Sequence, residues 1–401
     1  MREAYIVTSV RTPGCRRGKG AFAFTRPEDL LKSALNGLME RTPGVEKKDV
    51  EDILVGCAFP EAEQGLNIGR VIAQIAEFPD STCGATVNRF CASGLEAIAL
   101  QAMRIMAGYC DVAIGAGLES MSIVPMGGNL PRPHPEQALK SPEVYMSMGM
   151  TAENVANRYK ITREMQDEWG FHSQAKAAQA QKAGKFKEIV PTEAVRFVEK
   201  DGITVKETFI QDFDDGVRPT TIEGLAKLRP AFAAMGSVTA GNSSQTTDGA
   251  ACSLIMSGEA VKKFGVKPLA KLVVYTTAGC RADEMGVGPA YAIPKALKMA
   301  GLKVEDIGLW EVNEAFASQC IYSFQQLGLY EKKELWVSDS DKRIINVNGG
   351  AIALGHPLGC TGAKLCAQLT NEMRERGVKY GVESMCIGGG MGAAAVFELC
   401  D

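Results

Sequence analysis

The feature that most constrains the fold is an alternation of short β-rich runs with helical runs, which occurs twice along the 401-residue chain. In the first 120 residues the β-rich runs lie near residues 5–9, 53–57, 86–88 and 112–115. The segments between them have helical periodicity, and one begins at Pro27, a residue favoured in the first helical turn. This order is typical of βαβ units and predicts a largely parallel sheet covered by helices.

The same order of elements returns after residue 270 and indicates an internal duplication. The elements expected there are KLVVYTT (271–277), AIPKALKMAGL (292–302), IGLWEV (307–312), FASQCIYSFQQLGL (316–329), RIINVNG (343–349), KLCAQLTNEMRER (364–376) and two strands around 384–387 and 393–397. The clearest sequence match between the halves aligns VEDILVG (50–56) with VEDIGLW (304–310). We therefore predict an N-terminal half (1–120 plus 250–270), an inserted domain (121–249) and a C-terminal half (271–401).

Three segments are interpreted by their local pattern alone. The charged stretch TREMQDEWGFHSQAKAAQAQKAG (162–184) predicts a solvated amphipathic helix. GAGLES (115–120) lacks the third glycine of a dinucleotide-binding turn and is expected to be a tight turn. CRRGKG (15–20) is expected to be a solvated loop, with a basic patch near an anionic cofactor left open.

Composition excludes several classes of protein. A formal charge of −3 argues against a general nucleic-acid binder. The sequence contains no run of about 18 apolar residues, so no membrane span is predicted. The N-terminus lacks the pattern of a signal peptide, so we expect a cytoplasmic protein whose twelve cysteines are reduced. No C-x-x-C pair accompanies the three histidines, so we expect no metal site.

Three of the residues with reactive side chains stand at the ends of predicted strands. Cys91 in NRFCASGLEA lies where a strand gives way to a helix, a position that lowers the pKa of a thiol through the helix dipole. His356 lies in the glycine-rich turn of NVNGGAIALGHPLGCTGA, and Cys386 precedes three glycines in CIGGGMGAA that expose backbone N–H groups. Together they form a set of two cysteines and one histidine suited to nucleophilic catalysis.

These motifs, with GLESMS, MGMTAENVA, AKLRPAF, TAGNSSQTTDGAA and VNEAFA, resemble those of the thiolase family in their family order across nearly the whole chain. The resemblance implies an α/β fold of two duplicated halves, stacked in five α-β-α-β-α layers, with an inserted loop domain that binds coenzyme A. It implies that Cys91 is the acylated nucleophile, His356 its base and Cys386 the second acid/base. Asn313 would form one oxyanion hole with a water and His356, and the N–H groups of Cys91 and Gly388 the other.

The resemblance also implies where coenzyme A binds as a substrate, with no permanently bound cofactor. The nucleotide would lie near Arg218. The pantetheine would lie along Leu225, Ala231, Phe232, Ala240 and Ser244, and the acyl group would be surrounded by Met148, Met285, Ala315 and Phe316. The implied assembly is a homodimer or homotetramer, with a hydratase/dehydrogenase partner possible and no nucleic acid or membrane span.

Two departures from the biosynthetic pattern bear on the substrate. Ser147 stands where many acetoacetyl-CoA thiolases have a histidine, and GNSSQTTDG (241–249) is closer to the degradative 3-ketoacyl-CoA form. We therefore expect a 3-ketoacyl-CoA thiolase, with a biosynthetic acetoacetyl-CoA thiolase as the alternative. A non-catalytic acyl-CoA or lipid carrier on the same fold is the alternative from another class, although it would not need Cys91, His356 and Cys386 together.

Overall fold

The computed structural model describes residues 2–400 and places them in two similar halves. The first half follows the order β1 (Ala4–Arg11), β2 (Cys15–Arg16), α1 (Pro27–Glu40), β3 (Asp52–Gly56), α2 (Ile68–Ile75), β4 (Cys83–Val87), α3 (Ser93–Met106), β5 (Val112–Ser120), β8 (Thr247–Ser257) and α8 (Gly258–Phe264). The second follows β9 (Ala270–Gly279), α9 (Gly288–Ala300), β10 (Leu309–Val312), α10 (Ala317–Gln326), α11 (Ala351–Leu354), α12 (Thr361–Arg376), β11 (Tyr380–Ile387) and β12 (Met391–Leu399). Met1 and Asp401, which end the two predicted halves, lie outside the described residues.

The strand pairing repeats from one half to the other. In the first half β1 pairs with β8 and β8 with β5 in antiparallel fashion, whereas β5, β3 and β4 are parallel. In the second half β9, β12 and β11 pair antiparallel and β10 is parallel to β11. Within residues 2–400 the two half-sheets join only where β1 meets β9, through Tyr5 with Lys271 and Ile6 with Ala270. The duplication predicted from element order is confirmed.

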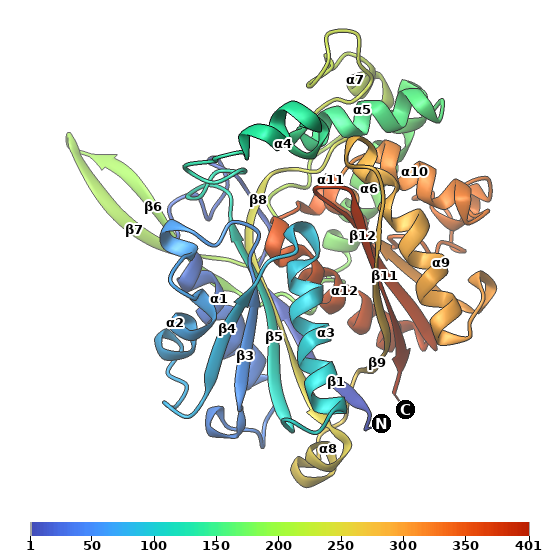
Figure 1. Cartoon of the computed structure of the whole chain (residues 1–401). Coiled ribbons are helices and arrows are strands. Elements are labelled where there is room, and N and C mark those ends of the chain that lie inside the picture. Colours follow the sequence, from blue (N-terminus) through green and yellow to red (C-terminus); the bar gives the residue numbers. More distant parts are fainter. Residues whose placement is uncertain (1, 401) are drawn as a thin grey trace.

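Five layers arise from the two half-sheets and three sets of helices (Figure 1). Helices α1 and α2 cover the outer side of the first half-sheet, and α9 and α10 that of the second. Helices α3 and α12 lie between the half-sheets, because Leu95 of α3 and Leu369 of α12 share one core with Ile6 of β1 and Phe397 of β12. The predicted α-β-α-β-α stack is therefore confirmed.

The ends of the helices follow local chemistry. Pro27 occupies the first turn of α1, followed by Glu28 and Asp29, whose charges favour the positive end of the helix. Helices α9 and α12 end at Gly301 and Gly377, whose φ values of 68° and 64° are left-handed and suit glycine. These signals were legible in the sequence, which is why the helices were predicted well.

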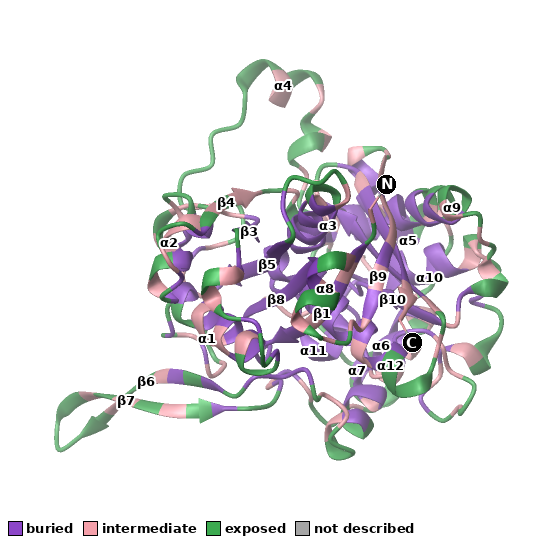
Figure 2. Ribbon diagram, turned by 90° about the horizontal axis from the view of Figure 1, so that it is seen from below, coloured by how far each residue is buried: buried purple, intermediate pink, exposed green. Residues whose placement is uncertain are grey.

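The chain between β5 and β8 forms α4 (Pro135–Lys140), α5 (Met148–Arg158), α6 (Arg163–Lys182), β6 (Thr192–Lys200), β7 (Ile203–Gln211) and α7 (Ile222–Ala226). β6 and β7 pair into a hairpin that projects from the body and is largely exposed (Figure 2). Helices α5 and α6 pack instead against α10 of the second half.

The prediction that α6 is solvated is wrong. Trp169 of α6 is only 2% exposed and stacks on Trp336 with ring centroids 5.1 Å apart. Lys176 is also buried, and its Nζ donates to the Ile345 carbonyl at 3.1 Å. Several polar residues of α6 face inward because partners from other segments satisfy them, which the charge pattern of one helix does not reveal.

The expected turn at residues 115–120 is also wrong, because this segment completes the fully buried strand β5. Its glycines serve close packing rather than a turn. A Cβ on Gly115 would lie 2.5 Å from the Ile98 Cα in α3, and one on Gly117 would lie 2.6 Å from the Gly359 carbonyl oxygen. Both distances are too short for a side chain.

Two details of the predicted duplication need correction. The run 343–349 is not a strand, since Ile345 forms only an isolated parallel bridge with Trp310. The sequence match between 50–56 and 304–310 is displaced by three residues. In both halves a short 3₁₀ turn precedes the second strand, and its last residue, Asp49 or Asp306, accepts a backbone N–H three residues earlier, at 2.9 and 2.8 Å. Asp306 therefore corresponds to Asp49, not to Asp52.

Candidate active site

Cys91 lies in a 3₁₀ turn, η3 (Phe90–Ala92), which joins the segment after β4 to α3. Phe90 has a left-handed φ of 43°, a strained value that the surrounding hydrogen bonds hold in place. The Asn88 side chain accepts the Phe90 N–H at 2.8 Å, and the Ser93 hydroxyl accepts the Arg89 N–H at 2.9 Å. The predicted junction thus fixes Cys91 at the N-terminal end of α3.

The Cys91 thiol is fully buried, and burial raises its pKa to about 12. The backbone N–H groups of Gly388 and of Cys91 itself oppose this rise by stabilising the thiolate. The expectation of a lowered thiol pKa is therefore wrong for this closed site, because desolvation outweighs the two hydrogen bonds. Cys91 is a protonated thiol at neutral pH and needs a base to become a nucleophile.

His356 is held by both its backbone and its ring. Its N–H donates to the Gln245 carbonyl at 3.0 Å, and Gly355 before it has a φ of 82°, which suits glycine. The ring Nδ1 bonds to the Thr361 hydroxyl, and that hydroxyl donates its own proton to the Pro357 carbonyl at 3.0 Å. Nδ1 must therefore be the protonated nitrogen, and Nε2 is left as the acceptor.

The environment of His356 keeps the imidazole neutral. Burial, together with the nearby charge of Lys364, lowers its pKa to about 3. The Asn313 Nδ2 lies 3.3 Å from Nε2, the unprotonated nitrogen. A neutral ring with an unprotonated Nε2 is the form that can accept a proton.

Cys386 lies near the end of β11 and is followed by three glycines, of which Gly389 and Gly390 have left-handed φ values of 84° and 88°. Burial raises the pKa of the Cys386 thiol well above its usual range, and the adjacent Cys91 thiol raises it further. The two predicted catalytic thiols are thus neighbours. Both are uncharged at neutral pH.

Met148, at the start of α5, connects the surroundings of the two thiols. It packs against the cluster of Cys91, Ala58, Met121 and Leu358, and also against the cluster of Cys386, Ala152, Val238, Met285, Ala315 and Phe316. A Cβ on Gly388 would lie 4.0 Å from the Met148 sulfur. The four residues predicted around the acyl group therefore line one apolar region beside Cys91 and Cys386.

A depression of about 490 Å³ leads from the surface toward these loops. Its lining includes predicted coenzyme A residues and the predicted solvated loop: Arg16, Arg17, Lys19, Arg218, Ala231, Phe232, Thr239, Ala240, Ser243, Ser244, Gln245 and Thr246. Within its lining, Thr246 forms a β-bridge with His356, and Ser243 forms one with Phe316. The depression thus adjoins both the histidine loop and the apolar region.

Leu225 is the one predicted pantetheine residue that does not line this depression. It is 5% exposed, and a Cβ on Gly241 would lie 2.4 Å from its Cδ2. Leu225 therefore packs beneath the loop that carries Ser243 and Ser244. Phe232 is 42% exposed and makes an edge-to-face contact with Phe316 at 6.0 Å.

Sequence reasoning assigned no role to Glu119, although it lies within the quoted GLESMS segment. Its fully buried carboxylate accepts the N–H groups of Ala58 and Gly359 at 2.8 Å each and the Gln64 amide at 2.8 Å. It thereby ties the loop after β3 to the turn η8 (Leu358–Cys360) that follows His356. An acid within an apolar strand sequence was the signal that could have revealed it.

Lys364 of α12 was also missed. Its buried Nζ donates to the carbonyls of Leu354 and Gly355 at 2.9 and 3.0 Å, immediately before His356. Burial lowers the pKa of Lys364 to about 8. Because the lysine follows His356 by eight residues on a helix, its helical spacing alone did not indicate that it reaches back to this loop.

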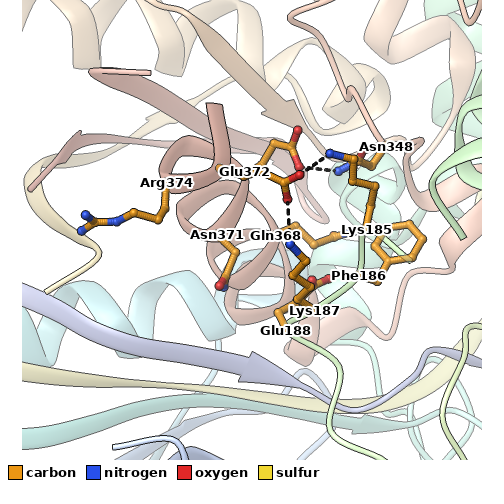
Figure 3. A pocket seen from close by; sticks show the side chains of 10 residues that line it. Lys185, Phe186, Lys187, Glu188, Asn348, Gln368, Asn371, Glu372 and Arg374 are labelled. Carbon is orange, nitrogen blue, oxygen red and sulfur yellow. Dashed lines mark hydrogen bonds and ion pairs between the residues drawn. The ribbon is translucent and has the colours of Figure 1, made fainter. Parts of the chain in front are cut away.

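A second depression lies beside α12 and has different chemistry (Figure 3). Lys185 and Lys187 both pair with Glu375, and the Asn348 amide donates to Glu372 at 2.8 Å. Its charges are thus compensated within the protein. None of the predicted site residues lies there.

Residues 2–400 contain neither a membrane-crossing helix nor a metal-binding cluster of side chains. The helices fall short of the length and apolarity that a membrane crossing demands. No group of three or more His, Cys, Asp or Glu side chains within this range is arranged to hold a metal ion.

Comparison with known proteins identifies the family. The family models "Thiolase, N-terminal domain" and "Thiolase, C-terminal domain" match residues 4–259 and 266–399. A 3-ketoacyl-CoA thiolase of Bacillus subtilis (strain 168) is 50% identical over 403 residues, covering 100% of both chains. The crystal structure of Bacillus anthracis acetyl-CoA acetyltransferase superposes with a TM-score of 0.86 at 36% identity, and that of human mitochondrial 3-ketoacyl-CoA thiolase with 0.85 at 35%. Each structure comparison covers 100% of this chain and 99% of the other. The chain belongs to the thiolase family.

Proposed function

We propose that this protein is a 3-ketoacyl-CoA thiolase, which cleaves a 3-ketoacyl-CoA with coenzyme A to give acetyl-CoA and an acyl-CoA shortened by two carbons. The observation that carries the proposal is the convergence of Cys91, His356 and Cys386 beside one apolar region that adjoins a surface depression. The relatives named as 3-ketoacyl-CoA thiolases support this choice of reaction.

In the first half-reaction the Cys91 sulfur attacks the 3-keto carbon while His356 Nε2 takes the thiol proton. The base is needed because burial raises the pKa of Cys91 to about 12. The bond between the second and third carbons then breaks, and its electron pair becomes the enolate of acetyl-CoA. Cys386 protonates that enolate, which leaves the shortened acyl group on Cys91.

In the second half-reaction the thiol of free coenzyme A attacks the acyl group on Cys91. The coenzyme thiol gives its proton to Cys386, which restores the thiol consumed in the first step. The Cys91 sulfur leaves and recovers its proton from His356. Atoms and protons therefore balance over the cycle, and synthesis is the same path in reverse.

Both half-reactions place negative charge on a thioester or keto oxygen, so fixed donors would stabilise them. We assign one oxyanion hole to the N–H groups of Cys91 and Gly388, since both approach the Cys91 sulfur. We assign the other to His356 and to a water held by Asn313, whose amide lies 3.3 Å from the histidine ring.

The acyl length is assigned from Ser147, the exposed residue at the N-cap position of α5 directly before Met148. A small side chain there leaves space beside the apolar region, which favours medium or long 3-ketoacyl groups. The likeness to an acetyl-CoA acetyltransferase keeps the four-carbon biosynthetic reaction as the alternative.

The decisive measurement is kcat/KM for thiolysis across 3-ketoacyl-CoA substrates from four carbons upward. We expect values that stay high or rise with length, and we expect Ser147→His to lower them most for the longest chains. Activity confined to four carbons would establish the biosynthetic alternative. Binding of acyl-CoA without turnover at any length would establish a carrier.

We further propose a homodimer or homotetramer in the cytoplasm, with coenzyme A as a substrate rather than a bound cofactor. A hydratase/dehydrogenase partner would supply 3-ketoacyl-CoA directly. Light scattering of the purified protein distinguishes the two assemblies, and co-purification from cells tests the partner.

A further inference from the structure

Of the predicted solvated loop at residues 15–20, Cys15 is buried, whereas Arg16, Arg17 and Lys19 have exposed side chains on a hydrogen-bonded backbone. Cys15 and Arg16 form the short strand β2, paired with Asp248 and Thr247 of β8. The Arg17 N–H donates to the Thr246 carbonyl at 2.9 Å, and Gly18, with a left-handed φ of 66°, donates its N–H to the Ser122 hydroxyl at 2.7 Å. The loop is therefore a rigid platform fastened beside the depression.

Four cationic side chains meet at the mouth of the depression: Arg16, Arg17, Lys19 and Arg218. Of these four cations, only Arg16 forms an ion pair within residues 2–400. Its Nε lies 3.5 Å from a carboxylate oxygen of Asp215. That carboxylate is already engaged, because it accepts the backbone N–H groups of Arg16 at 2.7 Å and of Ala21 at 2.9 Å. Positive charge is thus left in excess at this end.

Arg218 shows that the cations affect one another. Its side chain is exposed, its Nη2 donates within residues 2–400 only to the Ala240 carbonyl at 3.3 Å, and desolvation and the nearby Arg16 lower its pKa. Like charges held together on a fixed backbone are unfavourable unless an anion binds between them. The depression beside α12 lacks this feature, since Glu375 pairs with both of its lysines.

The residues that line the depression indicate how a ligand would lie in it. Part of the lining adjoins His356 and Phe316, where the proposed reaction takes place, and another part holds the four cations. Coenzyme A has the matching polarity, with a thiol at one end of an uncharged pantetheine arm and several phosphate charges at the other. Arginine and lysine are the side chains that bind phosphate best.

We propose that Arg17 and Lys19 of the N-terminal loop, with Arg16 and Arg218, bind the phosphate groups of the coenzyme A nucleotide. This inference rests on the proposed thiolase activity and extends it, since the family resemblance implied only Arg218 at this position. The loop acts on recognition of the carrier and does not touch the reacting carbons.

The test compares two donors that differ only in the nucleotide, 3-ketooctanoyl-CoA and S-(3-ketooctanoyl)pantetheine. In a ping-pong mechanism kcat/KM for the donor reports binding and acylation alone. We expect the double variant Arg17→Gln with Lys19→Gln to lower this value roughly 10-fold for the coenzyme A ester, as two exposed charge contacts would give. The value for the pantetheine ester should stay within about twofold, because that ester carries no phosphate.

Two variants serve as controls. Lys187→Gln removes a positive charge from the other depression and should leave both donors unaffected. Exchanging the cations, Arg17→Lys with Lys19→Arg, keeps the charge and should restore most of the preference for coenzyme A. Because the double variant retains Arg16 and its contact with Asp215, the backbone of the loop should remain folded.

An equal loss for both donors would overturn the inference, since it would indicate a structural role for the loop. Unchanged values for both donors would overturn it as well. Failure of the thiolase proposal itself is distinguishable, because the unmodified protein would then cleave neither donor.

Discussion

The first turns of α3 and α12 are equivalent positions in the two halves, yet they carry different chemistry. Each helix follows a 3₁₀ turn, η3 before α3 and η8 before α12, and each begins with a hydroxyl residue and a glycine. In this correspondence the proposed nucleophile Cys91 matches Gly359, and Ala92 matches Cys360. The second half places its reactive residue, His356, just before the turn instead.

The two helix starts are in direct contact. A Cβ on Gly94 of α3 would lie 2.6 Å from the Ala363 nitrogen of α12, and a Cβ on Gly362 of α12 would lie 2.2 Å from the Leu95 nitrogen of α3. This reciprocal contact brings Cys91 and His356 to the boundary between the halves. Duplication thus supplied a symmetric frame, and divergence at one turn made a site that neither half contains alone.

The largest effect is expected from replacing Cys91, the residue that distinguishes the turn η3 of the first half from the turn η8 of the second. Cys91→Ala should lower thiolysis by ~10,000-fold or more, because no sulfur is left to carry the acyl group. Intact-protein mass spectrometry after mixing with a 3-ketoacyl-CoA should show no acylated protein. Acylation at the native rate would show that another residue is the nucleophile.

Cys360→Ala is the matched control, since it gives the second half the residue that the first half has at that place. Cys360 is buried, and burial raises the pKa of its thiol to about 12, as for Cys91. We expect activity within about threefold of the native value, because replacing cysteine by alanine removes only one small buried group, the thiol. A loss as large as that of Cys91→Ala would remove the distinction between the two turns.

The contact between the helix starts gives the next effect. Gly362→Ala and Gly94→Ala should each destabilise the protein by about 3 kcal/mol, because the new methyl group meets backbone that cannot move freely. Urea denaturation measures this loss. Gly279→Ala, where a Cβ would meet no heavy atom within 4 Å, is the control and should be nearly neutral.

The smallest effect concerns Lys364, whose charge lowers the pKa of His356. Lys364→Met should raise that pKa from about 3, so the imidazole takes up a proton at higher pH. Proton NMR measures the shift directly, because the chain has only three histidines. Lys176→Met, which removes another buried lysine of pKa about 8, should leave the His356 titration unchanged.

The substitution Lys364→Met should also change how the stability of the protein depends on acid pH. The pKa of His356 in the folded protein, about 3, lies below its ordinary value of 6.5, so the folded state binds fewer protons. Its contribution to stability is complete above pH 6.5 and is lost as the pH falls toward 3. Lys364→Met should make this pH dependence shallower. An unchanged slope between pH 6.5 and 3 would contradict the proposed influence of Lys364.

Much of the fold could be predicted because its signals are local. Pro27, the glycines after α9 and α12, and the strand periodicity each report on their own segment. The errors occurred where distant residues decide. Trp169 and Lys176 are buried through partners in the second half, and Gly115 is a glycine because α3 passes over it.

Within the candidate site, the sequence by itself determined which residues carry reactive groups and where each lies relative to a strand or helix end. Only the tertiary structure decided their protonation and their supporting contacts. Burial reverses the expected pKa of Cys91, and Glu119 and Lys364 reach the histidine loop from other elements. The physical reason is that a dipole or a turn acts over one or two residues of chain, whereas desolvation and hydrogen bonding depend on everything that packs around the group.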